Sequence, residues 1–177
     1  MLLPWIVAAL YMIYKVHRFE FPGSISATYY VDACITPFMI ILGASGVLLF
    51  TYKGYDIVDN ILNTVAGTFG LGICLFPCGA TSEPYIGTFQ LPTDISDSLH
   101  MISAIGFFGI LAYNSIFQFT KGVPNPTPNK KKRNIIFRVC GIGMVVSLAL
   151  IVPVNIFHIW GGTWFVETLA LTFFGIS

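Results

Sequence analysis

Three histidines and a few acidic residues are the side chains in this sequence with the most potential for chemistry. His100 and Glu167 each fall just inside an apolar stretch, where water is scarce. A carboxylate beside an imidazole orients the ring and stabilises its charged form. We expect His100 and Glu167 to lie together, and we expect His158, Asp32 and Tyr30 to contribute to the same polar, ligand-binding site.

Two kinds of catalysis could use this group. A zinc centre built from His100, His158 and Glu167 would need three or four converging ligands, but the sequence lacks the H-E-x-x-H spacing that marks many such centres. Zinc is therefore a minor alternative, and the expected cofactor is none. A nucleophilic site would need His100 as base, an acid to orient it, and one of three serines, although no Gly-x-Ser-x-Gly motif is present. These serines are Ser24, Ser26 and Ser103.

Two other interpretations of the same residues involve no reaction. A few polar groups over an apolar floor suit a lipid headgroup or a small amphiphile. Alternatively, His100 and Glu167 bond each other and simply close one end of the fold.

The composition identifies the elements that must position these residues. Of the 177 residues, 55% are hydrophobic and 10% are charged, and the mean hydropathy is +0.79. Soluble domains carry roughly 25% charged residues, so this composition predicts an integral membrane protein and excludes a soluble enzyme. The net charge of +1 also excludes an extended basic surface for nucleic acid.

Six apolar stretches approach the roughly 20 residues that a membrane-crossing helix needs. They predict an all-α, polytopic six-transmembrane-helix bundle forming a single domain, 1–177. Because the last stretch is short, we expect the natural chain to continue past Ser177. The spans are expected near residues 2–16, 34–52, 57–76, 99–119, 135–156 and 164–176.

The basic residues predict the orientation of this bundle. Seven of the nine Lys and Arg residues fall at one end of the predicted spans, and Lys15 and Arg18 are the exceptions. Since basic loops stay cytoplasmic, both termini are expected inside a cell (plasma or inner) membrane. The connections at 17–33, 77–98 and 157–163, and with them the His100 site, are then expected outside.

The spans also contain small and polar residues that predict how the helices associate. Glycines in the second, third and fifth spans indicate close packing within the chain, with a homodimer seam as the alternative. Asp59 and Arg138 fall at nearly the same depth and predict a structural ion pair that fixes helix register. Of the cysteines near the outer side, Cys34 and Cys78 would pair if a disulfide forms, while free thiols in apolar packing are the first expectation.

Several segments resemble a family of small six-span bacterial integral membrane proteins with no assigned activity. The segments are PGSISATYY, FTYKGYDIVDNILNTVAG, DSLHMISAIGFFGILAYNSIFQFTK, KKKRNIIFRVCG and WFVETLALTFFGIS. This resemblance implies the topology and no chemistry. A looser similarity is to transmembrane hydrolases related to alkaline ceramidases, but the paired-histidine spacing of that superfamily is absent from the last span.

These observations predict a non-catalytic protein that binds a lipid or small ligand in an outer pocket, or that serves as an accessory subunit of a membrane-protein partner. Membrane lipids are the expected partners. The alternative is a metal-dependent, lipid-directed hydrolase at the outer leaflet, for which His100, Glu167 and Ser103 are the candidate catalytic residues.

Overall fold

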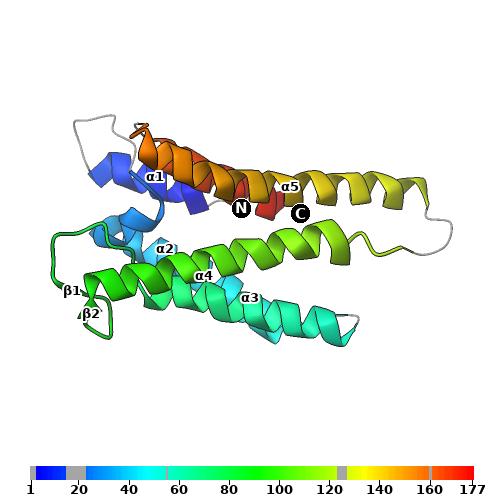
Figure 1. Cartoon of the computed structure of the whole chain (residues 1–177), viewed down its shortest axis with the longest axis horizontal. Coiled ribbons are helices and arrows are strands. Elements are labelled where there is room, and N and C mark those ends of the chain that lie inside the picture. Colours follow the sequence, from blue (N-terminus) through cyan, green and yellow to red (C-terminus); the bar gives the residue numbers. More distant parts are fainter. Residues whose placement is uncertain (1–2, 15–22, 55, 123–126, 160) are drawn as a thin grey trace.

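A computed structural model describes residues 3–14, 23–54, 56–122, 127–159 and 161–177. Within these residues the protein is almost entirely helical, and a two-residue hairpin is its sheet (Figure 1). The helices are α1 (Leu3–Tyr14), the 3₁₀-helix η1 (Ser26–Tyr30), α2 (Asp32–Thr51), α3 (Ile57–Leu75), α4 (Thr93–Tyr113), the π-helix η2 (Asn114–Gln118), α5 (Pro128–Ile156) and α6 (Gly162–Ile176).

Each of the six apolar stretches forms an α-helix, so the all-α prediction is confirmed. Four of them are long and apolar enough to cross a membrane, namely α2, α3, α4 with η2, and α5. The helices α1 and α6 have 12 and 15 residues, which at 1.5 Å per residue is about 18 and 22 Å. Both are shorter than the roughly 30 Å hydrocarbon core.

Two helices begin earlier than their apolar residues predict. The α4 helix begins at Thr93 rather than near residue 99, and α5 begins at Pro128 rather than near 135. At the start of α5, the Thr127 side chain accepts a hydrogen bond from the Lys130 N–H, and proline suits the first helical turn. Both starts lie in polar sequence, so a search for apolar residues does not find them.

The chain reverses at two opposite ends of the bundle (Figure 1). At one end, which we call the histidine end, lie η1, the hairpin of β1 (Tyr85–Ile86) with β2 (Leu91–Pro92), the start of α4 and the α5–α6 connection. At the other, the lysine end, lie the α2–α3 and α4–α5 connections and the first turns of α5 with Lys130 to Lys132. The predicted separation of His100 from the basic cluster is therefore confirmed, while Lys15 and Arg18 lie outside the described residues.

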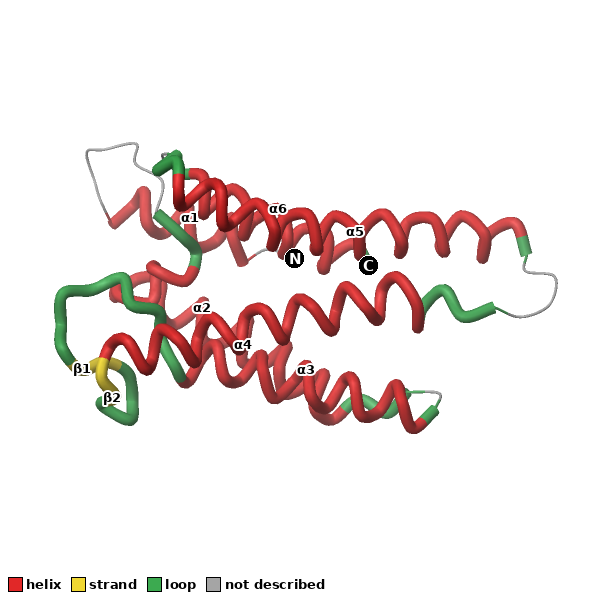
Figure 2. The backbone as a smooth tube through the Cα atoms, viewed as in Figure 1, coloured by secondary structure: helices red, strands yellow, loops and turns green. Residues whose placement is uncertain are grey.

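The helices follow a simple order of neighbours (Figure 2). The α3 helix packs against α2 and α4, α5 packs against α4 and α6, and α1 packs against α2. The backbones of α2 and α3 approach closely at their glycines, where a Cβ on Gly67 would lie 2.4 Å from the Phe50 nitrogen and 2.5 Å from the Gly46 oxygen. Internal packing is therefore the role of these glycines, as the sequence predicts.

The predicted Asp59–Arg138 pair is corrected by this arrangement. The α4 helix separates α3 from α5 (Figure 1), and Arg138 is exposed on α5. Among the described residues, the ion pair at the lysine end joins Lys121 Nζ to Asp56 Oδ2 at 2.8 Å. It connects the α2–α3 and α4–α5 connections, and Asp56 also caps α3 by accepting the Asp59 N–H.

The four cysteines are buried and free, as first expected, so the Cys34–Cys78 disulfide is not formed. The Cys34 thiol instead faces the Val7 carbonyl oxygen at 3.6 Å. Apolar packing accounts for this state, because a buried thiol behaves as a small hydrophobic group.

Candidate functional site

The site is built where the chain leaves α3 at the histidine end. A helix end leaves carbonyl oxygens without backbone donors, and here three consecutive carbonyls accept side-chain hydrogen bonds instead. The pairs are Phe76 O with His100 Nδ1 at 2.8 Å, Pro77 O with Ser96 Oγ at 2.8 Å, and Cys78 O with Tyr30 OH at 2.5 Å. These bonds join the end of α3 to α4 and η1, and so they fix the His100 ring.

The next residue, Gly79, is bound through its backbone N–H rather than through its carbonyl. The Gly79 N–H donates to Asp97 Oδ1 at 2.7 Å, and a Cβ at Gly79 would approach the Asp97 Cγ to 3.2 Å. Asp97 and His100 are three residues apart on α4, so they lie on the same face of that helix.

The phenol and the thiol beside this turn stay protonated. Burial, with smaller contributions from Cys78, Tyr29 and Asp97, raises the pKa of Tyr30 to about 12. Burial also raises the pKa of Cys78 to about 11. Tyr30 is therefore a permanent hydrogen-bond donor near neutral pH, and the Cys78 thiol is a poor nucleophile there.

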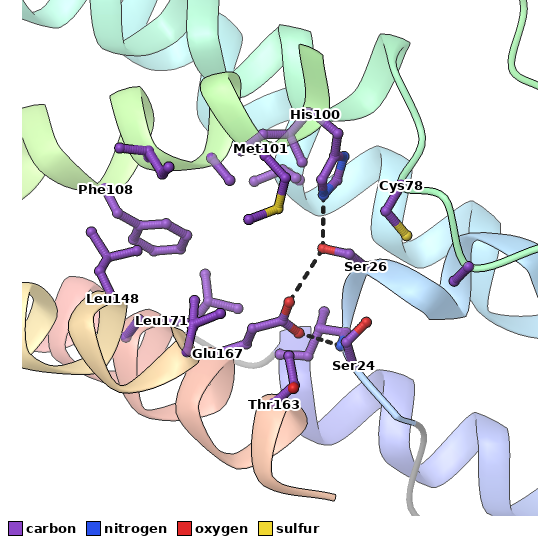
Figure 3. Close-up of a pocket in the computed structure, with 18 of the residues that line it drawn as sticks. Ser24, Ser26, Cys78, His100, Met101, Phe108, Leu148, Thr163, Glu167 and Leu171 are labelled. Carbon is purple, nitrogen blue, oxygen red and sulfur yellow. Dashed lines mark hydrogen bonds between the residues drawn. The ribbon is translucent and has the colours of Figure 1, made fainter. Parts of the chain in front are cut away.

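His100, Ser26 and Glu167 form a continuous chain of polar contacts (Figure 3). Ser26 Oγ lies 3.0 Å from His100 Nε2 and 3.4 Å from Glu167 Oε1. The other carboxylate oxygen, Oε2, accepts the backbone N–H of Ile25. Residues from η1, α4 and α6 thus meet at one point, where Ser26 lies between His100 and Glu167, which the sequence predicts to lie together.

The donors and acceptors of this chain allow two proton arrangements. A carbonyl only accepts, so His100 Nδ1 carries a proton in both. In one arrangement, the Ser26 hydroxyl donates to Nε2 and accepts from a protonated Glu167. In the other, it donates to the Glu167 carboxylate and accepts from a protonated Nε2. The two contain the same number of protons, so moving protons along the chain interconverts them without exchange with solvent.

A cavity of about 290 Å³ extends from the His100–Ser26–Glu167 contacts into the bundle. Its polar end has Ser24, Ser26, Asp97, His100, Asn155, Thr163 and Glu167. Its walls are apolar and include Phe38, Leu42, Ala104, Phe108, Leu148 and Leu171. Figure 3 shows Phe108 of α4 pointing across the space toward Leu148 and Leu171. A polar end joined to an apolar interior matches a molecule with a headgroup and a chain.

The cavity reaches the lateral surface of the bundle on the α4 side. Met101 and Ile105 line it, yet they are 42% and 58% exposed. Both side chains are apolar, so this opening is suited to hydrocarbon rather than water.

The structure brings together some of the predicted site residues and separates others. His100 and Glu167 line the cavity, whereas His158, Asp32 and Tyr30 do not. His158 is exposed on the α5–α6 connection, Asp32 is exposed at the start of α2, and Tyr30 bonds Cys78 O. These three residues therefore share one end of the bundle with His100 without lining the same cavity.

Among the three candidate serines, Ser26 is the one in contact with His100. Ser103 is buried against α3, where its Oγ would lie 2.5 Å from a Cβ at Gly72, so its candidate catalytic role has no support in this geometry. The position of Asp97 in the cavity wall was not predicted, although its spacing of three residues from His100 was the available signal.

The described residues contain no group of three or more His, Cys, Asp and Glu side chains arranged to hold a metal ion. His158 lies away from the cavity, and Ser26 separates His100 from Glu167. The three candidate zinc ligands therefore do not converge.

Comparison with protein-family models, curated proteins and solved structures finds no match to this chain. The function of this protein is therefore inferred from the geometry and chemistry of the site itself.

Proposed function

We propose that this protein is an integral membrane protein that binds an amphiphile, with the headgroup at the His100–Ser26–Glu167 chain and the hydrocarbon along the walls formed by α4, α5 and α6. The observation that carries the proposal is the cavity of about 290 Å³ with polar groups gathered at one end. Ligand pockets are usually about 300–1,000 Å³, so the space suits a headgroup and the first part of a chain. The remainder of the ligand's hydrocarbon chain would leave the cavity past Met101 and Ile105 and enter the lipid.

We place the bundle in a cell membrane with the lysine end cytoplasmic. All six helices then enter the bilayer, α1 and α6 as short spans, and both termini face the cytoplasm. The cavity would lie in the outer leaflet, where lipids reach it sideways. This placement is supported by Lys53, Lys121 and Lys130 to Lys132, which lie at the end opposite to His100.

The binding proposal is tested with 1-lauroylglycerol, a neutral amphiphile, added to the protein purified in a maltoside detergent. Native mass spectrometry measures the bound fraction. Ala104 lines the cavity, so Ala104→Phe should fill part of it and lower binding about tenfold or more. Ala149 is exposed on α5 away from the cavity, so Ala149→Phe is the matched control and should bind as wild type. Equal binding by both variants would refute the cavity as the site.

A second candidate function, hydrolysis of a lipid ester, is favoured by the contact between Ser26 and His100. With Nδ1 donating to Phe76 O, a neutral His100 presents an unprotonated Nε2 to the Ser26 hydroxyl. Ser26 Oγ would add to the ester carbonyl carbon while its proton passes to Nε2. The bond to the alcohol oxygen would then break as that oxygen takes the proton, and water would release the acid by the same steps. This route needs no metal ion.

Hydrolysis is tested with the same compound by measuring released laurate. Ser26→Ala should abolish release, and Ser98→Ala, at an exposed serine of α4, should not. Bound lauroylglycerol without any release would refute hydrolysis of this ester and leave the binding function. Zinc is measured in the same preparation, because stoichiometric zinc that is lost in His100→Ala would favour the metal-dependent form of the enzyme.

A further inference from the structure

The polar end of the cavity is acidic. Two carboxyl groups, Asp97 and Glu167, line it together with the His100 imidazole and the Cys78 thiol. Among the described residues that line the cavity, none is Lys or Arg. The Lys121–Asp56 ion pair and the basic turns of α5 lie at the lysine end of the bundle.

We infer that the amphiphile carries a primary ammonium headgroup, which binds at Glu167 and Asp97. This inference deepens the proposed function and rests on it. A negative headgroup would meet two carboxyl groups, and none of the described lining residues that face them is Lys or Arg. A buried charge without a partner is costly, whereas an ammonium group would be compensated by the carboxylates.

The hydrogen-bonding capacity of the two acids fits this headgroup. Each carboxylate oxygen accepts about two hydrogen bonds. Glu167 Oε2 receives the Ile25 N–H and Oε1 faces Ser26, which leaves acceptor sites on both oxygens. Asp97 Oδ1 receives the Gly79 N–H. An ammonium group has three donors and no acceptor, so it complements a wall in which carboxylates, hydroxyls and an amide oxygen predominate.

Proton placement along the Glu167–Ser26–His100 chain would respond to such a ligand. A cation beside Glu167 favours its carboxylate form. Ser26 then donates to Glu167, and the second proton lies on His100 Nε2. A neutral headgroup would not favour the ionised form of Glu167. Ammonium binding would therefore select the arrangement in which Glu167 is a carboxylate and both His100 nitrogens are protonated.

Two sources share this chemistry, namely a long-chain amine and the ammonium of a phosphoethanolamine lipid. The test compares dodecylamine, dodecanol, dodecanoate and dodecylphosphoethanolamine, which share one chain length, with native mass spectrometry of the full chain in maltoside at pH 7. An alkylammonium is charged there, as a lysine side chain is. We expect dodecylamine to bind about tenfold more tightly than dodecanol, because hydrogen bonds to ionised groups are the stronger ones. Binding of dodecylphosphoethanolamine at the strength of dodecylamine would assign the site to the phospholipid source, and much weaker binding would assign it to the amine.

Glu167→Gln should remove the advantage of dodecylamine and leave dodecanol binding within about twofold. Asp94 is an exposed acid in the first turn of α4 that does not line the cavity, so Asp94→Asn is the control and should retain the advantage. If dodecanol or dodecanoate binds as tightly as dodecylamine, the ammonium inference is wrong while the amphiphile site stands. If none of the four compounds is sensitive to Ala104→Phe, the proposed binding function itself is wrong.

Discussion

Replacing Gly67 with alanine provides the sharpest test of how this bundle is held together. A Cβ at Gly67 would lie 2.4 Å from the Phe50 nitrogen and 2.5 Å from the Gly46 oxygen, and both atoms belong to the α2 backbone. An ordinary contact begins near 3.4 Å, so α2 and α3 would have to separate by about 1 Å, the difference between 3.4 and 2.4 Å. Overpacking of this kind costs about 1–3 kcal/mol.

Gly109 offers the matched control, because it also lies inside a helix but has no atom within 4 Å of its added Cβ. Gly109→Ala should leave stability unchanged or raise it by up to about 1 kcal/mol through helix propensity. Thermal unfolding in maltoside, followed by circular dichroism, measures both variants. For a chain of this size, about 2–4 °C accompanies each kcal/mol, so Gly67→Ala should lower Tm by several degrees. A Gly67→Ala protein as stable as wild type would refute the close approach of α2 and α3.

Three further predictions concern the two ends of the bundle. The Lys121 ammonium and the Asp59 N–H lower the pKa of Asp56, so its stabilisation is present above the pKa of the unfolded chain and is lost as pH falls through the folded value. The fall in Tm on acidification should therefore be smaller in Asp56→Asn than in wild type, and an identical pH profile would contradict the pairing. Because burial raises the pKa of Cys78 to about 11, a variant with Cys78 as its single cysteine should react with iodoacetamide slowly at pH 8 and faster up to pH 11, whereas a rate that levels off near pH 9 would show an ordinary thiol. His100→Asn should preserve Tm better than His100→Ala, since an amide also donates to Phe76 O. In the His100→Asn protein, however, the binding of lauroylglycerol should no longer depend on Ser26.

Much of the fold could be predicted because apolar length and charge placement are properties of single segments. Each predicted span contains a helix, and the basic residues of the α4–α5 connection lie opposite to His100. The errors arise where polar residues continue a helix beyond its apolar part. The cap at Thr127 and the start of α4 at Thr93 are of this kind.

The ion pair at the lysine end shows a second limit of sequence reasoning. Depth in the membrane places Asp59 and Arg138 at one level, but depth does not say which helices are neighbours. Because α4 lies between α3 and α5, it is Lys121, from the α4–α5 connection, that pairs with Asp56 at the acidic end of α3 in the described part of the chain. The order of helices around a bundle depends on the packing of small residues such as Gly67, which a pattern along one chain does not specify.

The candidate site, like the fold, could be predicted only in part from the sequence. A polar side chain near the start of an apolar stretch needs a partner, and this reasoning selected His100 and Glu167, which both line the cavity. Choosing Ser26 over Ser103 required the path of η1, which the sequence PGSIS does not determine. The exposure of His158 likewise depends on the path of the α5–α6 connection, which its sequence does not determine.

The structural and functional interpretations of His100 differ in the use of one nitrogen. Closing the end of α3 needs a donor to Phe76 O, and Nδ1 supplies it. Any short donor side chain could serve there, as Ser96 does at Pro77 O. The second nitrogen, Nε2, has no part in that closure and instead faces Ser26 and the cavity. An imidazole is the neutral side chain that donates at one nitrogen and accepts at the other, with the donor position fixing the acceptor. A fold that used His100 for closure alone would have no need to aim Nε2 at a serine that also contacts Glu167, and this arrangement is the reason to seek a ligand or a reaction at the histidine end.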